Sequence, residues 1–192
     1  MISRVYEVPA EQATDCFGSA AALSRLAEHG YVEKEYFFDG TANVYERAED
    51  GEKALRFADA PYTSRFLLRM PARQEDFSGN IVVEIMNSTP GFDLDRSWII
   101  LREQLMREGD AYIGLLSKPN VIKSLQVFDP VRYAPLSWKN PVSYETFEAD
   151  AAMPGSTSPD TETGLYWDIL MDMGRLLRST DAINPLSDYV GA

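Results

Sequence analysis

The sequence predicts an α/β fold in which an antiparallel hairpin leads into a mostly parallel sheet with flanking helices. Two near-continuous apolar runs, Ile81 to Met86 and Ala111 to Leu116, have the composition of strands that are covered on both faces. An amphipathic segment, Arg96 to Glu108, lies between them. Strand, helix and strand within about 36 residues indicate a βαβ unit, whose two strands are parallel.

The first part of the chain predicts a helix. Apolar residues recur at helical spacing from Glu11 to His29, and Gly30 stands where a left-handed C-cap belongs. The composition changes after this glycine. We therefore divide the chain into an N-terminal helical segment, 1–29, and an incomplete α/β domain, 30–192.

Strands are expected after Gly30. Aromatic and β-branched residues from Tyr31 to Arg47 predict two strands of an antiparallel hairpin, with Asp39 and Gly40 as its turn. A further strand is expected from Tyr62 to Met70, where Phe66 and Leu68 alternate with other residues, and a proline ends it.

Helices are expected in the rest of the chain. Asp95 and Gly109 are the expected caps of the helix in the βαβ unit. A short helix is plausible over Val121 to Val127, and a longer one over Leu165 to Arg178. The segment Asn184 to Ala192 should lead to the next parallel strand, so the sheet is expected to be incomplete.

The composition excludes several classes of partner. The chain carries 18 Lys and Arg against 30 Asp and Glu, a net charge of −12, and it has no basic cluster. Such a balance repels phosphate backbones and anionic lipids, so no nucleic acid and no membrane partner is expected. The N-terminus lacks the apolar core of a signal peptide, and no apolar run is long enough to span a bilayer. One cysteine cannot form a disulfide within the chain, which fits a soluble protein of the cytoplasm.

The loop after Met86 is the first candidate for a functional site, because ligands of open α/β sheets bind outside the carboxyl ends of the strands. It contains Asn87, Ser88, Thr89 and Gly91. Such a turn can point backbone N–H groups inward, where they stabilise a developing oxyanion. The alternative is a polar turn that caps the following helix.

Three carboxylates are further candidates. Glu84 interrupts the apolar strand, where an unpaired charge is costly to bury. It is either a catalytic or metal-binding group, or a strand-end residue or ion-pair partner of a nearby arginine. Asp168 and Asp172 share a helical face at a spacing that could hold a divalent cation. The alternative is a solvated face on which Asp172 pairs with Arg175.

Neither His29 nor Cys16 is expected to be catalytic. The single histidine falls in the last turn of a helix, where it interacts with the helix dipole. The cysteine is interpreted as a small apolar residue. The sequence contains no G-x-S-x-G, G-x-G-x-x-G, Walker-type, H-E-x-x-H or C-x-x-C motif, so no triad, cofactor or metal site is expected.

Six ordered blocks of the chain resemble a bacterial family of alpha/beta hydrolase domain proteins. They cover most of the sequence from Gly30 onward: GYVEKEYFFDGTANVYE (30–46), YTSRFLLRMP (62–71), FSGNIVVEIMN (77–87), REGDAYIGL (107–115), FDPVRYAPL (128–136) and GLYWDIL (164–170). The resemblance implies that 30–192 is an incomplete alpha/beta-hydrolase domain, the N-terminal half only. It further implies that the nucleophile and the rest of the triad lie outside this chain.

The resemblance implies an esterase-like activity on a small-molecule ester or related acyl bond. Asn87, Ser88, Thr89 and Gly91 would then belong to the oxyanion loop, and a missing C-terminal half or a partner chain would complete the sheet. The alternative is a non-catalytic interaction module derived from half of a hydrolase. A third hypothesis is a complete small enzyme that uses carboxylates such as Glu84, Asp93 or Asp168 with a metal.

Overall fold

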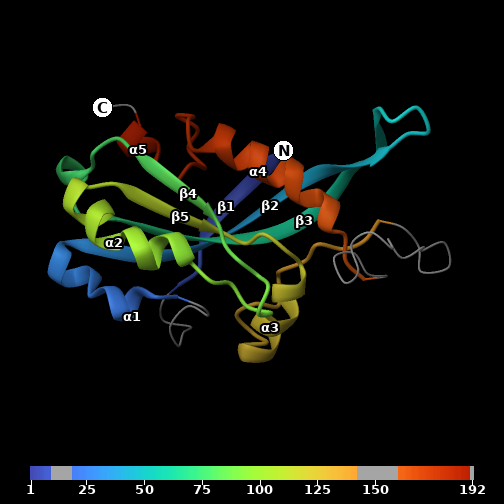
Figure 1. The fold of residues 1–192 in the computed structure, drawn as a ribbon. Coiled ribbons are helices and arrows are strands. Elements are labelled where there is room, and N and C mark those ends of the chain that lie inside the picture. Colours follow the sequence, from blue (N-terminus) through green and yellow to red (C-terminus); the bar gives the residue numbers. More distant parts are fainter. Residues whose placement is uncertain (10–18, 142–159, 191–192) are drawn as a thin grey trace.

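A five-stranded mixed sheet forms the centre of the molecule, with helices on both of its faces (Figure 1). The computed structural model describes residues 1–9, 19–141 and 160–190. The strand order is β1-β2-β3-β5-β4; β4 is parallel to β5, and the other neighbours are antiparallel. The strands are β1 (Ile2–Glu7), β2 (Tyr31–Arg47), β3 (Lys53–Pro71), β4 (Ile81–Ile85) and β5 (Ala111–Leu115).

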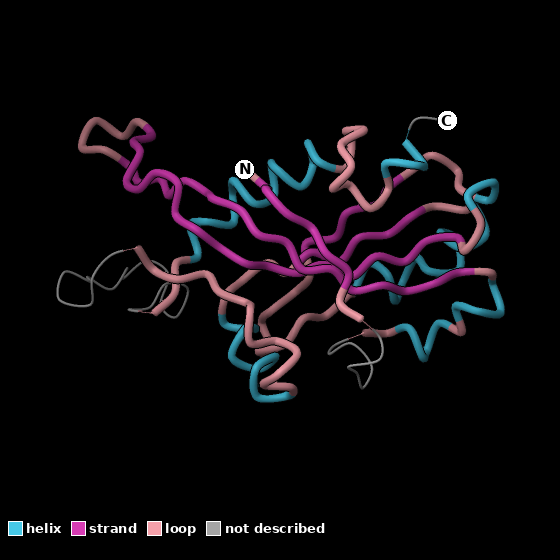
Figure 2. Tube along the Cα trace, turned by 180° about the vertical axis from the view of Figure 1, so that it is seen from behind, coloured by secondary structure: helices cyan, strands magenta, loops and turns pink. Residues whose placement is uncertain are grey.

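The helices divide between the two faces of this sheet. Helices α1, α2 and α3 lie on one face, and α4 and α5 lie on the other, as both views show (Figures 1 and 2). None of the helices in the three described ranges combines the length and the apolar character needed to cross a bilayer. Their bounds are α1 (Ala21–Ser24), α2 (Arg96–Glu108), α3 (Asn120–Phe128), α4 (Tyr166–Leu176) and α5 (Ser187–Val190).

The predicted hairpin turn is wrong. Asp39 and Gly40 lie in the middle of β2, which runs without a break; the true turn spans 48–52 and projects beyond the sheet (Figure 2). Gly40 is there because of close packing: a Cβ would lie 2.6 Å from the hydroxyl of Tyr62 and 2.7 Å from the carbonyl oxygen of Met1. An isolated glycine in a strand marks such an approach as readily as a turn.

The N-terminal prediction is partly wrong. The chain begins with β1, which pairs with β2 and which the sequence pattern does not predict. The described part of the expected helix is α1 followed by a 3-10 helix, Leu26–His29; Arg25 separates them with a φ of 48°. Gly30 is the left-handed C-cap as expected. The rest of the expected helix, with Cys16, lies outside the described residues.

The βαβ unit is confirmed. Strands β4 and β5 are parallel neighbours, and α2 between them has the predicted bounds, with Gly109 as its left-handed C-cap. Helix α3 forms as predicted and extends one residue beyond the predicted segment at each end, and α4 lies within the segment predicted for it. The chain after α4 ends, as far as it is described, in the short helix α5 and not in a strand.

Strand β4 is not covered on both faces, in contrast to its prediction. In the described part of the chain it pairs only with β5, at the edge of the sheet. Val83 is 37% exposed and Ile85 is 50% exposed, whereas all five residues of β5 are buried. An apolar run alone does not tell whether both faces of a strand are covered, or whether a strand pairs on both of its edges.

The two faces of the sheet differ in chemistry. Toward α4 the strands present an apolar core in which Phe66 stacks on Tyr36 and contacts Phe38. Toward α2 the same strands present buried charged side chains, and the aromatic pair of Trp98 and Tyr112 packs among them with ring centroids 5.0 Å apart. The polar face leads to the candidate site.

The packing of Gly109 against the backbone of Asp76 can be tested by substitution. A Cβ at Gly109 would lie 2.2 Å from the carbonyl oxygen of Asp76, whereas a Cβ at Gly51 meets nothing within 4 Å; both residues have positive φ. Gly51→Ala should lower the free energy of unfolding by about 1 kcal/mol, from backbone strain alone. Gly109→Ala should lower it by about 3 kcal/mol or more, because the clash adds to the strain. Equal losses in urea unfolding would contradict this packing.

Candidate functional site

The loop after β4 folds back on itself. Asn87 and Leu94 exchange backbone hydrogen bonds of 3.1 and 3.0 Å, which close the segment 87–94 into a loop. Inside it the N–H of Gly91 donates to the carbonyl oxygen of Ser88 at 3.0 Å, and the N–H of Thr89 donates to the Asn87 side chain at 2.8 Å. The φ of Gly91 is 84°, a conformation in which a side chain is strained. The loop at the carboxyl end of β4 is therefore a defined turn.

These internal bonds reduce the number of available oxyanion donors. The N–H groups of Asn87, Thr89 and Gly91 all donate within the loop. Of the four predicted residues, only Ser88 has an N–H without a hydrogen bond to any described residue. The Ser88 side chain is buried, and its hydroxyl also has no hydrogen-bond partner in the described part of the chain. The loop thus leaves both polar hydrogens of one residue uncommitted.

Helix α3 supports the loop from one side. The Asn120 side chain donates to the carbonyl oxygen of Ser88 at 3.1 Å, and the Ser124 hydroxyl donates to that of Gly91 at 2.5 Å. Ser117, just before α3, donates to the carbonyl oxygen of Met86 at 2.6 Å. These bonds orient the carbonyl groups of Met86, Ser88 and Gly91. The peptide group that carries the N–H of Ser88 is held separately, because its carbonyl oxygen, that of Asn87, accepts from the N–H of Leu94.

Strand β3 holds the loop from beneath through Arg65, which is fully buried. Its Nη1 lies 3.1 Å from Oδ2 of Asp93, in the loop, and its Nε lies 2.8 Å from Oε1 of Glu35, on β2. Glu35 also accepts from Arg132 at 2.5 Å. A buried guanidinium needs carboxylate partners to offset its lost hydration, so these contacts tie β2, β3, the loop and the segment after α3 together.

Arg69, further along β3, forms a second anchor. Its Nη2 lies 2.6 Å from Oδ2 of Asp95, and its Nε lies 2.6 Å from Oε2 of Glu33. The guanidinium also lies over the rings of Trp98 and Tyr112, at 4.6 and 5.3 Å from their centroids. Cation–π contacts add to such an ion pair when it is desolvated.

Asp95 stands at the predicted N-cap position of α2, but its side chain forms no cap bond there. Glu84 performs this function instead. Its carboxylate accepts from the N–H of Ser97 at 2.9 and 3.0 Å and from that of Trp98 at 3.2 Å, and it accepts from the Tyr112 hydroxyl at 2.6 Å. The helix N-terminus, and not an arginine, stabilises the buried charge of Glu84.

Burial changes the pKa of the loop carboxyls. Desolvation raises the pKa of Asp93 from 3.8 to about 6; Arg65 opposes this effect, and the charges of Glu35 and Asp95 add to it. Desolvation also raises the pKa of Asp95, against the opposing charge of Arg69. Asp93 Oδ1 has no hydrogen-bond partner among the described residues. Its carboxylate is therefore the less stabilised of the two.

The remaining candidates do not converge on the loop. Asp168 accepts from the N–H of Asn43 at 2.8 Å, and Asp172 pairs with Arg175 and with the N-terminal amine. His29 is exposed at the end of its 3-10 helix. Within the described ranges no three acidic, histidine or cysteine side chains are grouped closely enough to hold a metal ion.

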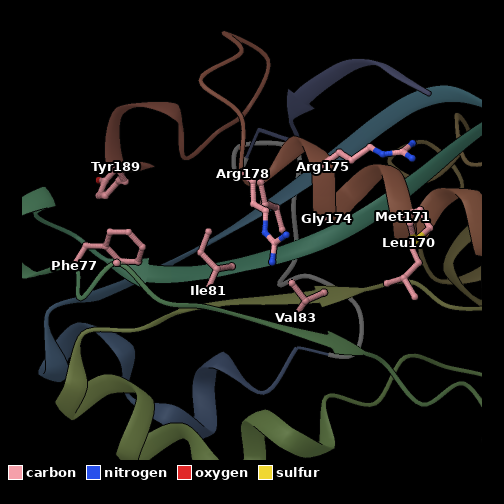
Figure 3. A pocket seen from close by; sticks show the side chains of 11 residues that line it. Phe77, Ile81, Val83, Leu170, Met171, Gly174, Arg175, Arg178 and Tyr189 are labelled. Atoms are coloured by element: carbon pink, nitrogen blue, oxygen red, sulfur yellow. The ribbon is translucent and has the colours of Figure 1, made fainter. Parts of the chain in front are cut away.

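A groove of about 780 Å³ lies apart from the loop, between β4 and helices α4 and α5 (Figure 3). Apolar side chains line most of it, among them Phe77, Ile81, Val83 and Leu170. Arg178 extends from the end of α4 toward β4 (Figure 3). The groove contains no loop residue, so cavity size and loop chemistry point to different parts of the molecule.

Neither arginine anchor is among the site residues that the sequence predicts. Arg65 and Arg69 flank three apolar residues in a strand, and they share a face because alternate residues of a strand point the same way. Charged residues at a regular spacing in a buried strand were the available signal. The carboxylates that pair with the two arginines come from distant segments, and strand periodicity does not show which distant residues become partners.

Glu84 provides a test of the polar layer. Glu84→Ala should lower the free energy of unfolding by about 2 to 4 kcal/mol, because two helix N–H groups and a buried hydroxyl lose their acceptor. Tyr112→Phe, the matched control, removes one of these hydrogen bonds and should cost about 1 kcal/mol. Urea unfolding of both variants measures the difference. A smaller loss for Glu84→Ala than for Tyr112→Phe would show that the carboxylate does not stabilise the helix.

The comparison with known families agrees with this architecture. The family model described as alpha/beta hydrolase domain matches residues 6–191. No curated protein and no solved structure matches the chain significantly. Because the match covers nearly the whole sequence, the chain belongs to the alpha/beta hydrolase domain family.

Proposed function

We propose that the chain is the part of an esterase-like hydrolase that carries the oxyanion loop. The observation that supports this most is the closed turn 87–94 at the carboxyl end of β4, in which the N–H of Ser88 has no partner among the described residues. A rigid backbone donor at this position suits a developing negative charge. The expected substrate is a small-molecule ester or related acyl compound, and the expected location is the cytoplasm.

In this proposal the loop acts on the transition state and not on the nucleophile. A serine, supplied from outside residues 1–192, attacks the carbonyl carbon, and the carbonyl oxygen takes up negative charge while a base takes the serine proton. The N–H of Ser88 donates to that oxygen, and collapse of the intermediate expels the alcohol, which takes the proton and leaves the acyl group on the serine. Water then attacks this acyl group in the same way and releases the acid and the free serine. A donor held in place before the reaction needs no reorganisation when the charge forms. The hydrogen bond from the N–H of Leu94 to the carbonyl oxygen of Asn87 orients the peptide group of this donor, and the bonds from Asn120 and Ser124 support the rest of the turn.

Gly91→Val tests the loop in the protein that contains the complete triad. Valine is strained at a φ of 84°, so the turn that Gly91 closes on Ser88 should open and displace the donor. We expect kcat for p-nitrophenyl butyrate to fall about 100-fold, with KM little changed. Initial rates of p-nitrophenol release measure kcat, normalised to the concentration of active enzyme found by labelling the nucleophilic serine with a fluorophosphonate probe.

Gly51→Val is the matched control, because Gly51 also has positive φ and open space but lies at the hairpin turn, far along the chain from the loop. Its kcat should equal that of the wild type. An unchanged kcat in Gly91→Val, with the fold intact by circular dichroism, would remove the oxyanion role from this loop.

A second candidate function is a non-catalytic interaction module. The observation in its favour is the edge of β4, where Val83 and Ile85 are exposed beside the apolar groove. An exposed apolar edge strand offers unpaired backbone groups to another strand. We propose that a strand from outside residues 1–192 pairs with this edge, as part of the same protein or of a partner chain.

Light scattering tests the need for such a strand. Residues 1–192 alone should self-associate at micromolar concentration, and Ile85→Lys should reduce this association by placing a charge on the edge. Leu55→Lys, at an exposed position of β3 outside the groove, should leave it unchanged. A stable monomer of the unmodified chain would rule out an obligatory partner at β4.

A further inference from the structure

The two arginine anchors of the loop are not equivalent. Arg69 meets Asp95 at 2.6 Å, and the same Asp95 oxygen also accepts from the N–H of Ala20 at 3.4 Å. Arg65 meets Asp93 at the longer distance of 3.1 Å, and each arginine also pairs with a second acid, Arg65 with Glu35 and Arg69 with Glu33. Asp93 is fully buried, and its second oxygen has no hydrogen-bond partner among the described residues. The Asp93 anchor is the weaker one.

The buried layer also holds more acids than bases. Apart from Glu84, whose charge the N-terminus of α2 stabilises, the ion pairs of the described residues around the loop join four carboxylates and three guanidinium groups: Glu33, Glu35, Asp93 and Asp95 with Arg65, Arg69 and Arg132. If every acid is ionised, the layer carries one uncompensated negative charge in a desolvated place, which is costly. A proton on the least stabilised carboxylate removes that charge.

Asp93 is the carboxylate best placed to take this proton. Arg65 faces it from β3, and Glu35 lies across Arg65 on β2. Asp95 follows two residues later, at the start of α2, and Arg132 neutralises the far side of Glu35. Asp93 thus has one cation beside it, Arg65, which it shares with Glu35, and two further acids nearby, Glu35 and Asp95. This arrangement favours its neutral form, and only loop opening would return it to water.

We propose that Arg65 is the positioning residue of loop 87–94, and that its hold on the loop is proton-linked through Asp93. Opening the loop exposes Asp93 to solvent and releases a proton, so the closed loop is favoured at acid pH and opens more readily toward neutrality. The consequence for donor geometry at Ser88 rests on the proposed function, whereas the proton linkage does not.

The direction follows from the two environments of Asp93. In the closed loop burial raises its pKa to about 6, whereas an exposed aspartate titrates near its usual value of 3.8. The closed state therefore binds the proton more tightly than the open state. The opening constant should rise with pH between these two values and become constant above the upper one.

Hydrogen exchange of the loop amides measures this opening. After correction for intrinsic exchange, the opening constant at the amides of Asn87, Gly91 and Leu94 should rise about 100-fold from about pH 4 to about pH 7. Asp93→Asn, which keeps the shape and removes the titrating group, should abolish this rise. Asp95→Asn, the matched control at the other anchor, should keep a rise, with its upper limit moved to lower pH because the Asp95 charge contributes to the raised pKa of Asp93.

Arg65→Lys separates positioning from charge. A lysine keeps the cation but cannot hold two carboxylates in the planar geometry of a guanidinium, so loop protection should fall at every pH while the pH dependence persists. Circular dichroism and urea unfolding establish that each variant is folded.

Two results would overturn the inference: exchange in the wild type that does not depend on pH, or the same dependence in Asp93→Asn. The wild-type series needs no variant, so the inference can be refuted even if a variant misfolds. A proton-linked loop together with full activity of Gly91→Val would refute the oxyanion role and leave the linkage standing. The converse pair of results would refute the linkage alone.

Discussion

Two guanidinium groups buried in one strand constrain the whole polar half of the molecule. Arg65 and Arg69 have no exposed surface, and a charge without water must be surrounded by counter-charges and hydrogen bonds. Strand β2 and the segment after β4 bring carboxylates to them, and Arg132, after α3, balances the charge of Glu35. The loop is thus tied to the hairpin as well as to its own βαβ unit.

The same constraint explains how α2 begins. Asp95 is engaged by Arg69 and does not cap the helix, so the first N–H groups need another acceptor. Glu84 reaches them from β4 and closes the layer through Tyr112. Two carboxylates have exchanged the functions that their sequence positions suggest, because burial of the arginine is the more costly problem.

Local signals predict the local structure well. The βαβ unit, the bounds of α2 and the Gly109 cap follow from periodicity and from the conformation of glycine, which short segments encode. The errors concern partners distant in sequence. Gly40 has the local pattern of a turn residue, and the contacts with Tyr62 and Met1 that require a glycine come from distant segments, so the local sequence does not reveal them. Likewise, the composition of β4 does not show that it lies at the edge of the sheet.

The candidate site divides in the same way. Its place, after β4, was predictable from the rule that sites follow strand ends, but the use of its N–H groups was not. Asn87, Thr89 and Gly91 direct theirs into the loop, and only the folded backbone shows that Ser88 differs. The anchors at Arg65 and Arg69 depend on acids contributed by separate parts of the chain, which one sequence does not connect.

The shared contact of Arg65 has a consequence for the variation of this family. A substitution at 65 leaves two buried carboxylates, Glu35 and Asp93, without their common cation, and a substitution at 93 changes the charge that the cation must balance. Position 65 should therefore not become apolar across related chains unless charge is also lost at 35 and 93. An uncharged residue at 93 is tolerated more readily, because Arg65 keeps its contact with Glu35 and the remaining acids and bases balance.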